Sequence, residues 1–343
     1  MGKLRIRRGA IERALGVLTA VLAAVPASAD DRPQLSLPLI CEPHRTCFIQ
    51  SYVDLDPGPG VQDYTCGSAT YEGHAGVDFR ILSAAAAAPG VPVVASADGT
   101  IKGVRDGVTD IFARENKAGD IKGRECGNGV LIDHGSGWET QYCHMKQGSL
   151  RVAKGQAVKR GDRLGDIGFS GLADFAHVHL TVRHDSKVID PFLPDATAGS
   201  CQQDSKSAGL WKAEVAAAFP YTNSEIIGFG FAGEAVDLNA LEKDHGAIAA
   251  LTTTSPGLIF YGRFINLLEG DRIRVAANGP GGSLAEELSL PLEHSKATYI
   301  SFAGQKRRAA PWPAGHYEGR VEIVREGAVV AAKVGEIVLK QQL

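Results

Sequence analysis

Two histidines separated by one residue, His177 and His179, lie in the segment Phe-Ala-His-Val-His-Leu-Thr-Val at residues 175–182. The apolar and β-branched residues around them predict a strand, in which side chains alternate between two faces. Both imidazoles then point to one face, where buried rings need partners for their polar nitrogens. A metal ion with a proton-transfer group beside it would meet that need, provided that the chain supplies further ligands.

Two upstream segments supply them. The segment Glu-Gly-His-Ala-Gly-Val-Asp-Phe at residues 72–79 places His74 and Asp78 four apart, among glycines that let the backbone approach a bound group closely. His144 stands in Gln-Tyr-Cys-His-Met at residues 141–145, near the end of a predicted strand. Two imidazoles and one carboxylate are a usual ligand set for catalytic zinc, with a fourth position left for water. One such histidine alone would indicate little, but their joint occurrence predicts a zinc site.

The order and spacing of these segments resemble the M23 zinc metallopeptidases, the lysostaphin- and LytM-type endopeptidases of bacterial cell walls. That family carries His-x-x-x-Asp, then a Tyr-Ala-His-Leu-like segment, then His-x-His. The matching residues here are His74 with Asp78, Tyr142-Cys143-His144-Met145, and His177 with His179. The resemblance covers about residues 51–192.

The resemblance implies that His74, Asp78 and His179 bind one zinc ion per chain, while His144 and His177 serve the chemistry. A zinc ion lowers the pKa of its bound water toward about 7, and a general base and an oxyanion stabiliser are still needed. No His-Glu-x-x-His segment supplies a glutamate base. Either remaining histidine could take the water proton while the other donates to the oxyanion. The implied substrate is the peptide cross-link of peptidoglycan, recognised through its peptide stems.

Three departures from the family pattern stand out. Cys143 and Met145 replace the alanine and leucine beside the second histidine, which are changes of packing. The charged, glycine-containing segment from Asp106 to Arg124 shows no clear period and reads as an inserted loop. Because this inserted segment could rim a substrate groove, the substrate preference of the family cannot be assigned to this chain from the resemblance alone.

Other functional classes have less support in the sequence. A catalytically silent relative that binds and activates a cell-wall amidase is the main alternative, but such relatives typically lack a metal ligand that this chain retains. A bacteriolysin acting on other species would carry a wall-targeting repeat, and none is recognisable. The spacing of valines and glycines over residues 152–162 also resembles lipoyl and biotinyl carrier domains, but the methionine or aspartate that commonly flanks their modified lysine does not occur in that form.

The charge of the chain bears on its partners, and its N-terminal residues bear on its cellular location. Lys and Arg number 36 against 39 Asp and Glu, so no basic excess indicates a nucleic-acid partner. Residues 1–29 have a basic start, an apolar run and Ala27-Ser28-Ala29, as in a cleaved signal peptide. We therefore expect a periplasmic or secreted protein that begins near Asp30 and has no membrane span in its mature form.

Six cysteines suit such a compartment. Six permit 15 pairings, among which sequence alone does not choose. Proximity suggests Cys41 with Cys47, and a predicted hairpin of residues 127–134 and 138–145 suggests Cys126 with Cys143. A structural zinc site is disfavoured because no Cys-x-x-Cys occurs.

Short strands with glycine turns and almost no helix predict an all-β chain. We expect a lead-in segment (residues 30–50), an M23-type antiparallel β-sandwich or barrel-like catalytic domain (51–202) and a C-terminal immunoglobulin-like β-sandwich (203–343). Residues 91–104 read as a hairpin about Asp98-Gly99, and the alanine-rich residues 83–90 as a surface excursion.

The C-terminal part alternates polar and apolar residues over 316–325, which is typical of a half-buried strand, with residues 328–339 as its hairpin partner. It carries no cysteine and no clustered histidine motif, so it could position the enzyme, bind a protein partner or cover the groove. The lead-in segment could also lie across that groove.

Several other polar residues are explained by structural roles and need no functional one. The acids of residues 54–56 suit a turn better than a calcium site, Tyr142 suits core packing, and His134 suits a structural role. The remaining histidines are expected at the surface: His184, His245, His294 and His316.

Overall fold

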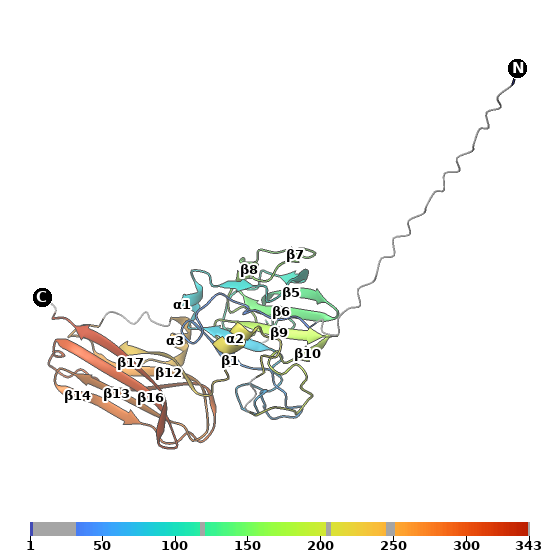
Figure 1. The fold of residues 1–343 in the computed structure, drawn as a ribbon. Coiled ribbons are helices and arrows are strands. Elements are labelled where there is room, and N and C mark those ends of the chain that lie inside the picture. Colours follow the sequence, from blue (N-terminus) through green and yellow to red (C-terminus); the bar gives the residue numbers. More distant parts are fainter. Residues whose placement is uncertain (3–31, 117–120, 204–206, 245–250, 342–343) are drawn as a thin grey trace. The chain divides into compact units, whose positions relative to one another are not determined.

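The computed structural model describes residues 1–2, 32–116, 121–203, 207–244 and 251–341. The expected signal peptide lies almost wholly outside the described residues, and so does the expected surface histidine His245. Arg32–Leu343 form one compact unit (Figure 1). Among the helices of the described residues, none is long and apolar enough to cross a membrane.

An eight-stranded antiparallel sheet carries the predicted site. Its order is β1-β2-β9-β6-β5-β4-β7, with β10 paired to β9. The strands are β1 (Cys47–Ser51), β2 (Val77–Ile81), β4 (Gly99–Arg105), β5 (Asn128–Gly135), β6 (Trp138–Met145), β7 (Ala157–Val158), β9 (His177–His184) and β10 (Lys187–Ile189). The predicted hairpin over residues 127–145 is confirmed by the pairing of β5 with β6. In β2 and β9, Asp78 lies opposite His179.

Period-two alternation explains how these two strands present the site. Val77 and Phe79 in β2, with Val178 and Leu180 in β9, pack into the main hydrophobic core. The residues between them, including Asp78, therefore point to the opposite face. The sequence prediction that both histidines of His-x-His share one face is confirmed.

The expected hairpin about Asp98-Gly99 is wrong. β3 (Pro92–Val94) pairs with β8 (Arg163–Asp166) in a small separate sheet, whereas β4 pairs with β5 and β7. Between β3 and β4 the backbone N–H of Ser96 donates to the Tyr142 hydroxyl, 2.7 Å away. The chain does turn near Asp98-Gly99, but there it passes from the small sheet that contains β3 to the large sheet that contains β4.

Helices are few and short, as expected. α1 (Ala84–Ala87) forms within the alanine-rich run and is capped by the Ser83 hydroxyl. The others are η1 (Ala113–Glu115), α2 (Ala213–Ala218) and α3 (Leu238–Lys243). Trp211 and Phe219, on either side of α2, join the same core as Leu35 and Leu39 from the lead-in segment. The domain boundary at residue 203 stays a prediction.

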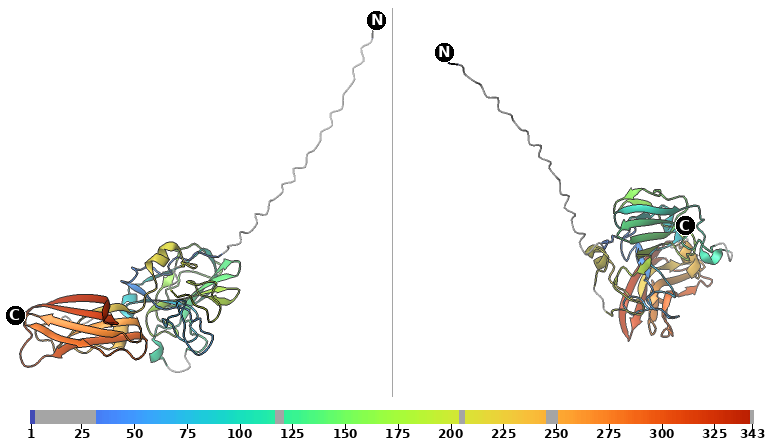
Figure 2. Two further views of the ribbon diagram at one scale, coloured as in Figure 1. Left: turned by 60° about the horizontal axis from the view of Figure 1, so that its bottom comes forward. Right: turned by 90° about the vertical axis from the view of Figure 1, so that its right-hand side faces the viewer.

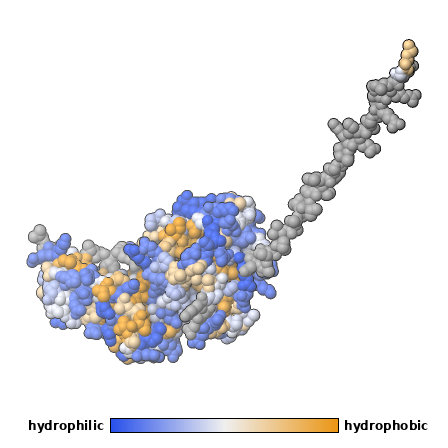
Figure 3. All heavy atoms as spheres, viewed as in Figure 1, coloured by the Kyte–Doolittle hydropathy of each residue, from blue (hydrophilic) through white to orange (hydrophobic). Residues whose placement is uncertain are grey.

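The C-terminal part contains two antiparallel sheets (Figure 2). One has the order β11-β12-β15 and the other β14-β13-β16-β17, with apolar residues of both in one core. The strands are β11 (Glu225–Ala232), β12 (Gly257–Leu267), β13 (Arg272–Gly279), β14 (Gly282–Leu288), β15 (Lys296–Lys306), β16 (Gly315–Arg325) and β17 (Ala328–Leu339). The all-β prediction is thus confirmed, while the immunoglobulin-like assignment stays a prediction. Figure 3 shows apolar patches scattered among polar surface on one face of the unit.

All six cysteines form disulfides. The predicted pairs Cys41–Cys47 and Cys126–Cys143 are confirmed. The third, Cys66–Cys201, closes 135 residues, and proximity along the chain gave no reason to choose it.

Candidate metal centre

His74, Asp78 and His179 bring three ligand atoms together at the junction of β2 and β9. Asp78 Oδ1 lies 2.8 Å from His179 Nδ1 and 3.2 Å from His74 Nε2. The two imidazole nitrogens lie 3.1 Å apart. Asp78 and His74 are each only 2% exposed. The structure therefore places the three residues that the resemblance implied as ligands around one point.

Hydrogen bonds orient both rings toward that point. His74 Nδ1–H donates to the Tyr52 carbonyl at 2.6 Å, which leaves Nε2 as the ligand atom. His179 Nε2 lies 3.0 Å from Thr181 Oγ1, and a bond from Nε2–H to this oxygen leaves Nδ1 as the other ligand atom. Such outer partners commonly fix the tautomer of metal-binding histidines.

The donor set fits a small cation. Ligand atoms at about 2.1 Å from a tetrahedral zinc ion would lie about 3.4 Å from one another. The three observed separations, 2.8 to 3.2 Å, are somewhat shorter than this value. Two ring nitrogens that face each other with their lone pairs repel unless a proton or a metal cation lies between them, and the Asp78 carboxylate adds negative charge that favours either one.

His144 and His177 flank the ligands, with ring centroids 4.5 Å apart. His144 Nδ1–H donates to the Ser170 carbonyl at 2.8 Å, and His177 Nδ1–H donates to the Phe175 carbonyl at 2.9 Å. Each ring therefore keeps Nε2 for another partner. His177 Nε2 lies 3.5 Å from Asp78 Oδ1, so this ring borders the ligand set directly.

A strained junction at the end of β6 aims His144. Its φ of +61° lies in the left-handed region, which a side chain with a Cβ seldom adopts. The Cys126–Cys143 disulfide and a bond from His144 N to the Cys126 carbonyl (2.8 Å) hold this turn. Gly127, also at positive φ, allows the Ser170 backbone to approach so closely that a Cβ would lie 2.4 Å from its carbonyl carbon. Such strain persists only where surrounding contacts impose it.

The charges of the site favour neutral flanking histidines. Burial lowers the pKa of His144 well below its ordinary value, and the neighbouring His177 and His179 add to this. Burial also lowers the pKa of His177, although Asp78 acts in the opposite direction. For Asp78, burial would raise the pKa, but His74, His177 and His179 hold it well below its usual range. At neutral pH the site thus combines a carboxylate with two uncharged bases.

Three contributors to the site were missed from the sequence. Thr181 follows His179 by two residues on the same strand face, so strand periodicity could have found it. Ser170 and Tyr52 act through backbone carbonyls, which carry no side-chain signal. The readings of Tyr142 and His134 hold: Tyr142 is fully buried in the core, and His134 bonds to the Asp98 carbonyl and Thr140.

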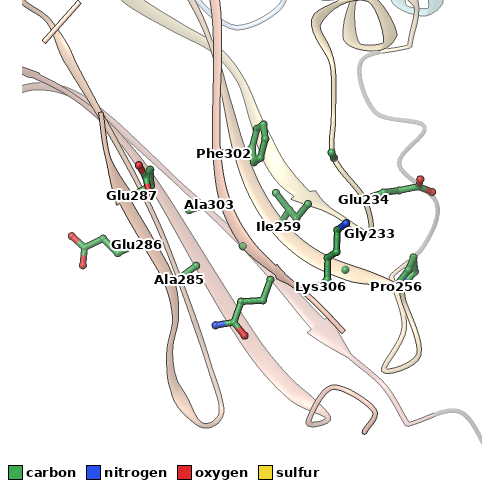
Figure 4. Close-up of a pocket in the computed structure, with 14 residues that line it drawn as sticks. Gly233, Glu234, Pro256, Ile259, Ala285, Glu286, Glu287, Phe302, Ala303 and Lys306 are labelled. Carbon is green, nitrogen blue, oxygen red and sulfur yellow. The ribbon is translucent and has the colours of Figure 1, made fainter. Parts of the chain in front are cut away.

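The metal centre opens into a pocket of about 440 Å³ that Asp78 and His177 line. Tyr71 also lines it and stacks on His74, with ring centroids 4.3 Å apart. A separate cavity of about 600 Å³ lies in the C-terminal sandwich, where Phe302 and Ile259 line it beside Lys306 (Figure 4). The described residues that line this second cavity include neither histidine nor cysteine.

A family model described as peptidase family M23 matches residues 72–191. That range holds all five site residues. The chain therefore carries a peptidase family M23 domain, and the resemblance drawn from three short motifs is confirmed.

Two curated relatives match the same part of the chain. DD-carboxypeptidase/endopeptidase Mpg of Neisseria meningitidis serogroup B is 32% identical over 124 residues, which is 36% of this chain and 23% of that protein. Peptidoglycan DD-endopeptidase ShyB of Vibrio cholerae is 30% identical over 122 residues, again 36% and 23%. The chain thus spans about a quarter of the length of these relatives. Among solved structures, a zinc containing peptidase from Vibrio cholerae is 24% identical, with a TM-score of 0.30, over 46% of this chain and 38% of that one.

Proposed function

We propose that the protein is a zinc metalloendopeptidase that hydrolyses peptide cross-links of bacterial peptidoglycan. The observation that carries the proposal is the arrangement of His74, Asp78 and His179, whose ligand atoms converge beside two further histidines held by backbone carbonyls. In the proposed enzyme these three residues hold one zinc ion per chain. When bound, the ion supplies Lewis-acid activation of a water and of the scissile carbonyl.

The flanking histidines manage the proton and the developing negative charge. His144 and His177 each present Nε2 while Nδ1–H is engaged by a carbonyl, so each ring can accept a proton at Nε2 and then donate it. One takes the proton of the attacking water at Nε2. The other stabilises the oxyanion as an imidazolium, whose Nε2–H donates to it after that ring has taken up a second proton from solvent. Because both rings are packed in place, neither must reorganise during the reaction.

The proposed substrate and the proposed location are supported by observations other than the geometry of the site. The names of the relatives concern DD-endopeptidase and carboxypeptidase activity and, for one, peptidoglycan. The signal-like residues 1–29 and three disulfides suit the periplasm or the cell exterior, where this polymer lies. We accordingly propose that the mature chain acts there on peptide stems.

The test combines metal content with turnover. The chain from Asp30 onward, purified from an oxidising compartment, is assayed for zinc and incubated with purified cross-linked muropeptides. We expect about one zinc per chain, and cleavage that His144→Ala, His177→Ala and His179→Ala each abolish. His184→Ala is the matched control, because His184 lies on the same strand but stacks on Trp138 instead.

Each unfavourable outcome is distinct. Zinc loss should accompany His179→Ala but not His144→Ala. A wild-type chain that binds zinc yet cuts no muropeptide would refute the proposed activity. A chain with neither zinc nor cleavage would favour the amidase-regulator alternative, which the intact ligand set does not favour.

A further inference from the structure

Of the three candidate metal ligands, only His74 lies outside the main sheet. Asp78 and His179 lie opposite each other in β2 and β9, so the backbone pairing of the two strands fixes their positions. His74 precedes β2 and ends a tight turn, in which its N–H donates to the Tyr71 carbonyl at 3.0 Å and Gly73 has a φ of +72°. The placement of the His74 ring therefore depends on contacts from neighbouring segments.

The segment that follows β1 supplies these contacts from two sides. The Tyr52 carbonyl accepts the Nδ1–H of the His74 ring at 2.6 Å. Two residues further on, the backbone N–H of Asp54 donates to the His74 carbonyl at 2.8 Å, and the Asp54 carboxylate accepts the Gly73 N–H at 2.9 Å. One short segment thus holds both the ring and the backbone of this ligand.

Thr70 fixes the carbonyl that orients the ring. Its Oγ1–H donates to the Tyr52 carbonyl oxygen at 2.7 Å, so this oxygen accepts one hydrogen bond from Thr70 and one from His74. A carbonyl oxygen has two acceptor lone pairs, and both are used here. The Tyr52 N–H donates in turn to the Ala69 carbonyl at 2.9 Å, and Tyr52 is only 2% exposed. The carbonyl therefore keeps one direction, and with it the ring tautomer that leaves Nε2 of His74 for a metal.

Asp54 joins the turn at His74 to the loop that precedes it. While Oδ2 accepts the Gly73 N–H, Oδ1 accepts the N–H groups of Gln62 at 3.0 Å and Asp56 at 3.2 Å. Hydrogen bonds to a charged carboxylate are stronger than those between neutral groups. Asp54 therefore does more than close a turn of its own, which is all that its position in the sequence indicates.

We propose that Asp54 and Thr70 are positioning residues of the metal centre, which act through His74 without binding the ion themselves. Asp54 sets the backbone of His74, and Thr70 sets the Tyr52 carbonyl that orients its ring. Both residues lie outside the range 72–191 that the family model matches. The inference rests on the proposed function, since it concerns a ligand of the zinc ion in the proposed enzyme.

The first test measures the zinc Kd of the purified chain by competition with a chromogenic chelator, with no substrate present. We expect Asp54→Ala to raise the Kd about 10-fold, as loss of an outer partner of a metal-binding histidine does. Asp56→Ala is the matched control, because it removes a carboxylate from the same loop, where it accepts the Gly58 N–H at 2.7 Å instead. This control should change the Kd less than about threefold, since a partly exposed charge without direct contact has a small effect.

The second test removes one hydroxyl and then restores it. Thr70→Val keeps the shape of the side chain but loses the donor to the Tyr52 carbonyl, and should raise the zinc Kd about 3- to 10-fold, the equivalent of one hydrogen bond. Thr70→Ser keeps the hydroxyl and should keep the wild-type Kd. Thr65→Val is the control, because its hydroxyl donates to Asp63 at 2.9 Å and not to Tyr52. If Asp54→Ala fails to fold by circular dichroism, the Thr70 pair decides alone.

A double-mutant cycle separates positioning from a general loosening of the loop. If Asp54 acts through His74, adding Asp54→Ala to His74→Ala should change the residual zinc Kd less than about twofold. An equal loss of affinity in both backgrounds would overturn the proposal, and so would a wild-type Kd in both Asp54→Ala and Thr70→Val. Lowered zinc affinity in these two variants, beside a zinc-loaded wild type that cuts no muropeptide, would instead preserve the positioning role and refute the peptidase activity.

Discussion

Replacing Asp78 with asparagine should nearly abolish zinc binding without changing the fold. The carboxylate is 2% exposed and lies within 3.2 Å of the ligand atoms of His74 and His179. Asparagine keeps the shape and one oxygen but removes the negative charge that offsets a buried dication. Removing one partner of a buried charge pair costs about 3–5 kcal/mol. That cost corresponds to a zinc affinity lower by about 10² to 10⁴.

The measurement is a competition titration against a chromogenic zinc chelator, with circular dichroism to verify the fold. Asp133→Asn is the control, because it removes the same charge from an exposed position on β5 and should change zinc affinity less than threefold. If Asp78→Asn bound zinc within threefold of the wild type, Asp78 could not be the ligand that neutralises the ion.

Three further changes test the framework. Gly127→Ala should lower the melting temperature and the turnover together, because its Cβ would meet the Ser170 backbone, whereas Gly103→Ala, with open space around it, should affect neither. Glu242→Gln should cost about 3–5 kcal/mol in urea unfolding by leaving its two buried arginine partners underneutralised; an unchanged midpoint would contradict this ion pairing. Asp190→Asn should remove a pH dependence of stability. Burial raises the pKa of Asp190 to about 7, so between about pH 4 and pH 8 the folded state binds more protons than the unfolded state. The free energy of unfolding of the wild type should therefore fall over this range by up to about 4 kcal/mol. Parallel melting curves of wild type and Asp190→Asn over that range would refute this reasoning.

The candidate site could be predicted from sequence because its members lie at short, patterned spacings. His177 and His179 lie two apart on one strand, so strand periodicity places both on one face. His74 precedes β2 and lies only four residues from Asp78, so the short spacing brings this pair together without long-range information. The Cys126–Cys143 disulfide followed in the same way from a hairpin.

The pairings that were predicted wrongly, or not predicted, join residues that are far apart in the sequence. The turn at Asp98-Gly99 has a hairpin signal, yet β3 finds its partner in β8, some seventy residues further on. The Cys66–Cys201 disulfide and the Arg80–Glu242 pair likewise join residues that are 135 and 162 positions apart. Local propensity reports which segments form strands and turns, whereas such pairings depend on how the completed elements pack.

The arrangement of β2 links the candidate metal centre to α3. Asp78 and Arg80 are two residues apart on one strand, so both side chains project from the same face. Asp78 turns toward the histidines, and Arg80 turns toward Glu242 of α3. A five-residue strand that is buried throughout cannot shift one of these side chains without moving the other. Variants of Glu242 should therefore alter the position of the Asp78 carboxylate, and with it zinc affinity, as well as stability.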